Sequence, residues 1–196
     1  DDCSTDKSKE IINKYSTNSK INKFFLTKNK GPSFCRNIGI RKSSSDYICF
    51  LDSDDIWKKN KLNDQLQFMI KNDYSFTFSN YTNIYSDNSK KEVITKKKFN
   101  LKNFQMDTSI NSSTMILKRS IIGLTKFKRI NLLEDYLFKC DLLKKNITAY
   151  NVNSSLAFYR INSNSRSNSK FKNIYWLWII NKRYNKLNFL KNIFSL

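Results

Sequence analysis

Apolar residues along the chain follow two different spacings. Short apolar or alternating runs, which are typical of strands, occur at residues 21–26, 47–51, 74–81, 113–118, 147–152 and 156–161. A spacing of three or four residues, which is typical of an amphipathic helix, is clearest over residues 61–71, where Leu62, Leu66 and Met69 share one face. Strands and helices that alternate along the chain in this way predict an α/β layer fold.

The other segments are assigned from their capping residues and their polar content. Helices are predicted from a cap at Ser4, Thr5 or Asp6 to Tyr15, over residues 34–41, over residues 119–124, and from Glu134 onwards. Gly31-Pro32 marks a loop, and the Ser- and Asn-rich residues 162–170 mark another. The polar, Lys-rich residues 86–105 are predicted to form a mobile excursion, and residues 175–196 form an aromatic, Lys-rich amphipathic tail.

Three carboxylates directly follow the predicted buried strand 47–51. They are Asp52, Asp54 and Asp55, and like charges this close raise each other's pKa unless a cation lies among them. Oxygen ligands without nitrogen suit Mg2+ or Mn2+, bound together with a phosphate-bearing ligand. The alternative is a polar loop after a core strand, leading into a helix whose N-terminus favours acids.

Two further acidic pairs, Asp1-Asp2 and Glu134-Asp135, also lie at junctions between apolar segments. Ligand sites of open α/β sheets gather at the carboxyl ends of the strands, so the three acidic sites are expected to converge there. One would hold a nucleotide, one a metal, and one would act as a general base, while Arg36 would bind a phosphate or a base. The alternatives are helix caps or first turns for both acidic pairs and a solvated surface position for Arg36.

Composition narrows the class of protein. The 196 residues suffice for one domain with a sizeable core, and the formal charge of +20 would attract nucleic acid, anionic lipid or a polyphosphate substrate. The positive charge is scattered apart from residues 96–98, which weakens the case for a nucleic-acid site. The chain has no His, and its four Cys form no CxxC pair, which argues against a zinc site and favours a reducing compartment. No apolar run approaches the roughly 20 residues that span a bilayer.

Six motifs, in order, resemble those of family 2 glycosyltransferases with the GT-A fold. They are Asp1-Asp-Cys-Ser-Thr-Asp6, Gly31-Pro-Ser-Phe-Cys-Arg-Asn-Ile-Gly-Ile40, Phe50-Leu-Asp-Ser-Asp-Asp-Ile-Trp57, Ser113-Thr-Met-Ile-Leu-Lys-Arg119, Leu133-Glu-Asp-Tyr136, and Tyr159-Arg-Ile161 followed by Ser165 and Ser167. Cys35 stands where the family usually has Ala, and Asn162 stands where many members have His. The resemblance covers essentially the whole chain.

The resemblance implies an α/β fold of the GT-A type, with a Rossmann-like mixed sheet flanked by helices. Residues 1–170 would form the catalytic domain, and residues 171–196 an amphipathic, aromatic helical tail. Members of the family begin with a strand and a helix before the first of these motifs, so the chain is expected to be truncated at its N-terminus.

The implied activity is the transfer of a sugar from a nucleotide-diphosphate sugar to an acceptor hydroxyl, with inversion at the anomeric carbon. The setting would be the assembly of cell-surface polysaccharide or lipopolysaccharide, with a saccharide or lipid-linked acceptor, no nucleic acid partner and a cytoplasmic location. The tail would either lie peripherally on the inner face of the membrane or pack back on the domain.

The resemblance also implies roles for individual residues on the donor side. Asp2 would hydrogen-bond the nucleoside base, and Ser4 would line the same pocket. Arg36 would contact the base or the diphosphate, and Asp52 and Ser53 would bind the nucleotide sugar.

The metal and the base are implied in the same way. Asp54, with Asp52, would ligate Mn2+ or Mg2+, which neutralises the leaving nucleotide diphosphate. Asp135 would be the general base, with Glu134 beside it.

Three other functions remain open from the residues. A nucleotidyltransferase can share the fold and the acidic site. A phosphatase with an Asp-x-Asp nucleophile also has acids after a strand, although Asp55 and Ile56 stand where it usually has Thr or Val. A basic nucleic-acid-binding or non-catalytic nucleotide-binding protein would fit the positive charge, and the acidic clusters argue against the former.

Overall fold

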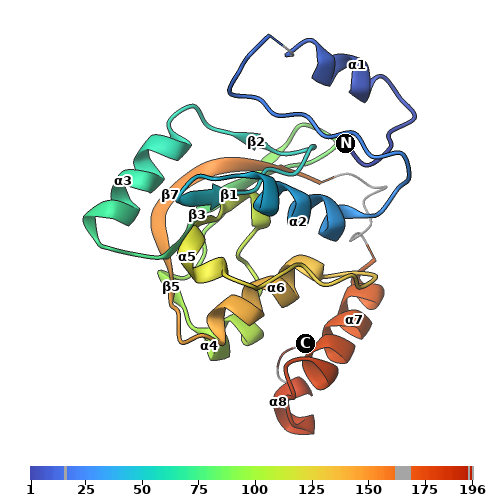
Figure 1. Cartoon of the computed structure of the whole chain (residues 1–196). Coiled ribbons are helices and arrows are strands. Elements are labelled where there is room, and N and C mark those ends of the chain that lie inside the picture. Colours follow the sequence, from blue (N-terminus) through green and yellow to red (C-terminus); the bar gives the residue numbers. More distant parts are fainter. Residues whose placement is uncertain (16, 162–168, 194, 196) are drawn as a thin grey trace.

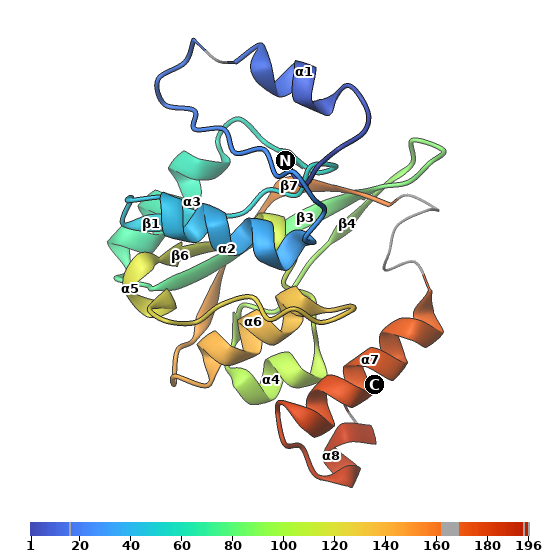
Figure 2. The ribbon, with the colours of Figure 1, turned by 45° about the vertical axis from the view of Figure 1, so that its right-hand side comes forward.

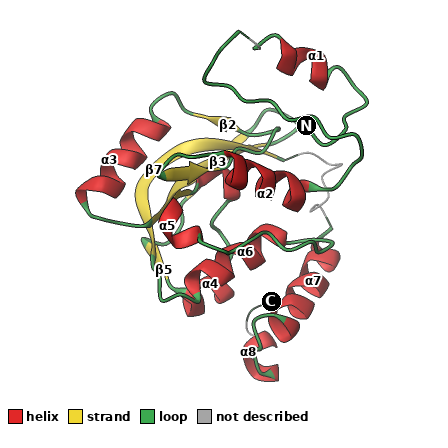
Figure 3. Ribbon diagram, viewed as in Figure 1, coloured by secondary structure: helices red, strands yellow, loops and turns green. Residues whose placement is uncertain are grey.

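A mixed β-sheet lies at the centre of the molecule, with helices around it (Figure 3). The computed structural model describes residues 1–15, 17–161, 169–193 and 195. Within this part of the chain the sheet has seven strands: β1 (Tyr47–Cys49), β2 (Ile56–Trp57), β3 (Phe76–Ile84), β4 (Lys90–Val93), β5 (Lys98–Phe99), β6 (Ile116–Lys118) and β7 (Ala149–Arg160).

The helices fall between these strands and at the two ends of the chain. They are α1 (Ser8–Asn13), α2 (Pro32–Lys42), α3 (Lys61–Lys71), α4 (Leu101–Met106), the 3-10 turn η1 (Ser112–Thr114), α5 (Arg119–Ile122), α6 (Glu134–Leu143), α7 (Lys170–Arg183) and α8 (Phe189–Ile193). Helix α1 lies at the opposite end of the molecule from α7 and α8 (Figure 1). The predicted α/β fold is confirmed.

The sheet runs in the order β1-β6-β3-β7-β2, with β4 on β3 and β5 on β7. Strands β3 and β7 pair in parallel, while the other pairs are antiparallel. The predicted strands 147–152 and 156–161 are one long strand, β7, which is curved in Figure 1. Its register against β3 shifts between Phe78 and Tyr81, where β7 carries extra residues, and bulges of this kind bend the strand that contains them.

Local sequence explains where the main helices begin and end. Gly31 has φ 85°, a conformation that costs glycine little, and Pro32 occupies the first turn of α2, where its missing N–H is not needed. Helix α3 has the predicted bounds, residues 61–71. It begins with Lys61, which is fully buried and donates to Gln65 Oε1 at 2.9 Å, and burial lowers its pKa to about 8.

The core is rich in aromatic side chains from both halves of the chain. Phe50 meets Phe127 and Phe138 edge-on, and Phe127 stacks on Phe138 with 3.9 Å between ring centroids. These contacts join the strand before the acidic loop to α6, because Phe138 belongs to α6. The core therefore fixes the distance between the two acidic motifs.

Two sequence-based predictions are wrong. Residues 21–26 are not a strand. Their backbone makes a local bond from Ile21 N to Asn18 O at 3.0 Å and two bonds with Asp1, from Asp1 N to Phe24 O at 2.7 Å and from Leu26 N to Asp1 O at 3.0 Å. A strand needs a longer ladder, and the described residues provide none beside this segment.

Residues 86–105 are not a mobile excursion, because β4, β5 and α4 lie within them. Strand β4 pairs with β3 and β5 with β7. Thr95, Phe99 and Phe104 are buried, and the last two are in edge-on contact with 5.9 Å between centroids. A search for apolar runs does not find these elements, because their buried side chains are single positions among many lysines.

The two ends of the chain differ in part from the sequence prediction. The N-terminal helix is shorter than expected and begins at Ser8, and Asp6 accepts the Ser8 backbone N–H at 2.9 Å. The tail forms α7 and α8, and α7 buries Ile180 in the core. The predicted loop 162–170 falls mainly on residues 162–168, which lie outside the described residues, as do Asn162, Ser165 and Ser167 of the last motif. The division of the chain into a domain of residues 1–170 and a tail stays a prediction.

Candidate active site

A cleft of about 560 Å³ opens where the acidic loop after β1 faces the N-termini of α2 and α6. Its walls come from five places: Pro32 and Arg36 of α2, Asp52, Ser53 and Asp54 of the acidic loop, residues 108–112, residues 132–136 with Lys139, and Tyr81 and Tyr159 of β3 and β7. In Figure 2, α2 and α6 lie on the same side of the sheet. Six residues predicted for the site therefore line one cleft: Arg36, Asp52, Ser53, Asp54, Glu134 and Asp135.

Arg36 joins two of the acidic motifs directly. Its Nη2 atom lies 2.6 Å from Asp52 Oδ1, and its Nη1 atom lies 3.1 Å from Glu134 Oε1. The side chain is 16% exposed, and the Phe127 ring lies beneath the guanidinium, 5.4 Å from ring centroid to Cζ. A planar guanidinium with several N–H donors can hold two carboxylates at once, which an ammonium does less well.

Asp135 is held by two donors on a single oxygen. Its Oδ2 atom accepts from Ser112 Oγ at 2.9 Å and from Lys139 Nζ at 2.8 Å. Burial raises the pKa of Asp135, but the charge of Lys139 and its hydrogen bond, with help from Arg36 and Ser112, outweigh burial and hold the pKa well below its usual range. Asp135 is therefore a carboxylate at neutral pH.

Asp55 is the member of the acidic loop that does not line the cleft. It is 7% exposed, accepts from Ser113 Oγ at 2.5 Å, and accepts the backbone N–H of Arg160 at 3.3 Å. The Asp52 backbone N–H also donates to Ser113 Oγ, at 3.1 Å. Burial raises the pKa of Asp55 to about 6, against the lowering effect of the Ser113 hydrogen bond. Asp55 thus anchors the loop to β7, while Asp52 and Asp54 line the cleft.

Asp54 is the carboxylate most available to a metal ion. It is half-buried, and among the described residues it has no hydrogen-bond or ion-pair partner, whereas Asp52 is bound to Arg36. No group of three or more potential metal ligands occurs in the described part of the chain. One or two carboxylates completed by phosphate oxygens is a common way to bind Mg2+, so the residues fit a cation that enters with a diphosphate.

Asp2 and Ser4 do not line the cleft. Both carboxylate oxygens of Asp2 accept backbone N–H groups, from Lys30 and Gly31, each at 2.7 Å. Ser4 is exposed, and its N–H donates to Asp1 Oδ1 at 3.0 Å. Asp2 therefore braces the loop that leads into α2, and its contact with a nucleoside base stays a prediction.

The backbone before α6 is in an unusual conformation. Leu133, the residue before Glu134, has φ 61° and ψ 31°, the left-handed region that L-residues other than Asn, Asp and Gly seldom adopt. Backbone of this kind is held in place by surrounding contacts and is frequent at functional sites. Here it turns the chain so that Glu134 and Asp135 begin the helix at the cleft.

Several residues that line the cleft were not predicted from the sequence. Lys139 could have been found as the lysine four residues after Asp135 on the predicted helix, since such pairs meet on one face. Ser112 and Tyr81 have no comparable signal, because only the folded chain brings them beside residues distant in sequence. Trp57, the last residue of the third motif, is half-buried and donates from Nε1 to Ser113 O at 2.7 Å.

Replacing Arg36 tests its role as the link between the two motifs. In Arg36→Met, Asp52 and Glu134 lose their shared cation, so we expect the free energy of unfolding to fall by about 2–4 kcal/mol, less than for a fully buried pair because Asp52 is partly exposed. Chemical denaturation at neutral pH measures the change. Arg41→Met, at an exposed position of the same helix, is the control, and a loss for Arg36→Met no larger than for the control would contradict the assignment.

Comparison with known proteins gives the family. A family model described as "Glycosyl transferase family 2" matches residues 1–126. The chain is 39% identical over 200 residues to an uncharacterized glycosyltransferase of Haemophilus influenzae, covering 99% of this chain and 78% of that protein. It is 30% identical over 178 residues to an Escherichia coli enzyme, UDP-Glc:alpha-D-GlcNAc-diphosphoundecaprenol beta-1,3-glucosyltransferase WfgD, covering 91% and 70%.

A solved structure gives the fold. The crystal structure of Staphylococcus aureus TarS residues 1–349 in complex with UDP-GlcNAc superposes with a TM-score of 0.71 at 18% identity. The match covers the whole of this chain and 60% of the TarS chain. Together these matches favour a transferase over a basic nucleic-acid-binding protein. The chain therefore belongs to glycosyl transferase family 2 and has the GT-A fold that its motifs predict.

Proposed function

We propose that this protein transfers a sugar from a nucleotide-diphosphate sugar to an acceptor hydroxyl during the assembly of a cell-surface polysaccharide. The observation that carries the proposal is the cleft in which Arg36 joins Asp52 to Glu134, with Asp54 and Asp135 in the same walls. A metal-binding acid and an ionised base that come from distant segments suit a displacement in which base and leaving group lie on opposite faces of the sugar.

We propose a uridine diphosphate hexose, or a related sugar such as an N-acetylhexosamine, as the donor. Support comes from the names of similar proteins: WfgD uses UDP-Glc, and TarS was solved with UDP-GlcNAc. Arg36 and Ser53 line the cleft where the diphosphate would lie, and Asp52 would approach the ribose. Asp2 and Ser4 would bind the nucleoside base outside the walls of this cleft, and Asp2 would use the lone pairs that its bonds to the backbone of Lys30 and Gly31 leave.

We propose that Asp54, with Asp52, holds a Mn2+ or Mg2+ ion that enters with the donor. When bound, the ion neutralises the charge that develops on the departing nucleotide diphosphate. The carboxylate of Asp54 fits this role because it has no hydrogen-bond or ion-pair partner among the described residues. The same residues contain no group of three or more potential metal ligands, so phosphate oxygens of the donor would complete the coordination. Asp52 would have to share its carboxylate with Arg36.

We propose that Asp135 is the general base and that Glu134 supports it through Arg36. Asp135 is ionised at neutral pH and lines the cleft, so it can accept the proton of the incoming hydroxyl. The hydroxyl, which loses that proton as it attacks, would approach the anomeric carbon from the face opposite the leaving diphosphate, and this single displacement inverts the configuration. Glu134, which is 8% exposed, keeps Arg36 in place between the two acidic motifs.

We also propose that the acceptor is a saccharide or a lipid-linked saccharide and that α7 and α8 touch an anionic membrane surface. The name of WfgD specifies a diphosphoundecaprenol-linked acceptor. Phe171 and Tyr175 of α7 and Phe189 and Leu190 of α8 are exposed, and the sequence has no Asp or Glu after Asp141. Exposed aromatic side chains among lysines suit an anionic interface. Within the described residues no helix is long and apolar enough to cross a bilayer.

Removing Asp54 tests the metal site. We expect Mn2+ to tighten the binding of UDP-glucose or UDP-N-acetylglucosamine to the wild-type protein by at least about tenfold, equivalent to about 1.4 kcal/mol. Asp54→Ala should bind the donor equally with Mn2+ and with EDTA, because the ion loses its free carboxylate. Titration calorimetry measures both, with Asp87→Ala, a surface turn, as the control. An undiminished Mn2+ effect in Asp54→Ala would refute the metal assignment.

Neutralising Asp135 tests the base. Asp135→Asn should bind the donor as the wild type does but release UDP about 10²–10⁴-fold more slowly with water as the acceptor, because no carboxylate accepts the proton. Donor binding is followed by calorimetry and UDP release by a coupled assay. Asp141→Asn, on the same helix but outside the cleft, is the control. Unchanged turnover in Asp135→Asn would rule out the assignment.

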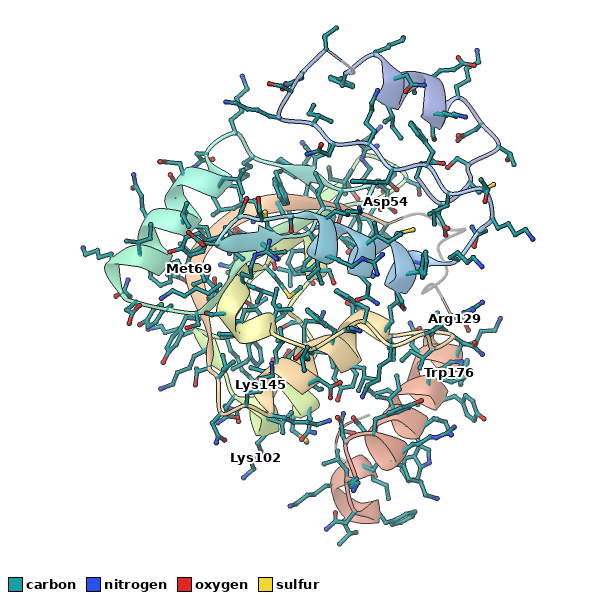
Figure 4. All side chains as sticks on the ribbon, in the orientation of Figure 1. Asp54, Met69, Lys102, Arg129, Lys145 and Trp176 are labelled. Atoms are coloured by element: carbon teal, nitrogen blue, oxygen red, sulfur yellow. The ribbon has the colours of Figure 1, made fainter. Side chains whose placement is uncertain are left out.

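Serine in place of the exposed aromatic residues tests the membrane contact. We expect the wild-type chain to co-sediment with phosphatidylglycerol vesicles and much less with phosphatidylcholine vesicles, and the double variant Phe171→Ser/Tyr175→Ser to lose most of this binding. Phe24→Ser, an exposed aromatic in the segment between α1 and α2, is the control. Figure 4 shows Trp176 on the same helix. Equal sedimentation of the double variant and the control would contradict the proposal.

A further inference from the structure

The two carboxylate oxygens of Asp135 have different surroundings. Oδ2 accepts both Ser112 Oγ, at 2.9 Å, and Lys139 Nζ, at 2.8 Å. Oδ1 has no hydrogen-bond partner among the described residues. The side chain is 31% exposed and lines the cleft. One oxygen is therefore fixed by the protein, and the other is available to a ligand.

Lys139 is more deeply buried than a surface ion pair requires. Its side chain is 3% exposed, and Nζ also donates to the backbone carbonyl of Ile110 at 2.6 Å. The Phe104 ring lies 5.7 Å from Nζ, centroid to atom. Because Ile110 and Ser112 belong to the segment that forms one wall of the cleft, Lys139 and Ser112 tie the first turn of α6 to that wall. A buried ammonium is costly unless its hydrogen bonds are made, so we expect Lys139 to keep its bonds to Asp135 and to the Ile110 carbonyl.

We propose that Lys139 and Ser112 are positioning residues for the reaction: they hold Oδ2 of Asp135, so that Oδ1 is the atom that receives the proton of the attacking hydroxyl. This inference rests on the proposed function, and it deepens the role of Asp135 there. Nothing in the motif pattern assigns a role to either residue.

The step balances without a further reactant. The oxygen of the acceptor hydroxyl, or of water in hydrolysis, forms a bond to the anomeric carbon while its proton passes to Oδ1. The bond from the anomeric carbon to the phosphate oxygen breaks, and its electron pair leaves with the nucleotide diphosphate. Because Oδ2 is already saturated by two donors, it can neither take the proton nor rotate freely into the place of Oδ1.

The charges around Asp135 explain why a lysine is present. The charged and titratable groups that share the cleft with it are Lys139 and Glu134 of α6, Arg36 of α2, Asp52 and Asp54 of the acidic loop, Tyr81 of β3, and Tyr136 and Tyr159. Burial favours a protonated carboxyl group, and Lys139 is the cation in direct contact that opposes this effect, with help from Arg36 and Ser112. Lys139 thus keeps the base ionised, at the expense of some basicity.

The test follows the pH dependence of turnover and the pKa of one carboxyl group. In Lys139→Met, Asp135 keeps its burial but loses its cation, so its pKa should rise by about 1–3 units. The acidic limb of UDP release from UDP-glucose or UDP-N-acetylglucosamine, measured with Mn2+, should move upward with it. Carbon-13 NMR of the carboxyl group, assigned by comparison with Asp135→Asn, reports the same pKa without turnover. The wild-type group should titrate below the usual range.

Ser112→Ala removes the other donor and keeps the charge of Lys139, and it also serves if Lys139→Met does not fold. We expect kcat to fall by about tenfold or more with donor KM unchanged and with a smaller displacement of the pH profile. Lys144→Met is the matched control, because Lys144 ends the same helix, pairs with Asp141 at 2.9 Å and lies outside the cleft. The control should match the wild type in both kcat and pH profile.

The outcomes separate this inference from the function on which it rests. If Asp135→Asn is inactive while Lys139→Met and Ser112→Ala keep the wild-type kcat and pH profile, the positioning roles are overturned and the base assignment stands. A lower thermal midpoint in these two variants with unchanged kinetics and an unchanged carboxyl pKa would show a purely structural role and would overturn the inference. Full activity in Asp135→Asn, or no turnover of any donor by the wild type, would overturn both proposals.

Discussion

The ion pairs of Arg36 are the constraint on which the geometry of the site depends. One guanidinium lies between Asp52, in the loop after β1, and Glu134, at the start of α6 and about 80 residues later in the sequence. Without this guanidinium, the carboxylates of Asp52, Glu134 and Asp135 would repel one another across a partly buried space. The stacked rings of Phe127 and Phe138 beneath it set the same spacing through packing, so charge and core specify one arrangement.

The acids of the cleft divide into those that hold the structure and those left for a ligand. Asp55 anchors the loop through Ser113 and the backbone of β7, Asp2 braces the loop before α2, and Glu134 holds Arg36. Asp54 and one oxygen of Asp135 have no partner among the described residues. A partly buried carboxylate without a partner is costly unless a cation or a reacting hydroxyl binds it, so these two carboxylates are the candidates for binding the metal ion and for accepting the proton.

Sequence patterns predicted what depends on local spacing. Helix 61–71, the strand before the acids and the order of the motifs could be predicted because periodicity and short motifs encode them directly. The order within residues 86–105 could not, since Phe99 and Phe104 are single apolar positions in a polar stretch whose burial depends on distant strands. The donors to Asp135 were missed for a related reason: Ser112 meets Asp135 only in the folded chain, and Lys139 looks like an ordinary surface lysine until its burial is known.

In the proposed function, this cleft binds a nucleotide diphosphate together with a divalent cation at Asp54, which is labelled in Figure 4. The most direct measurement is a crystal structure of the chain grown with UDP and Mn2+, with the metal located by anomalous scattering. We expect one manganese peak in ligand contact with the Asp54 carboxylate and with oxygens of the diphosphate, and we expect Oδ1 of Asp135 to be open to the space beyond the phosphates. A nucleotide bound away from Arg36 and the acidic loop, or a manganese peak without contact to Asp54 or Asp52, would contradict it.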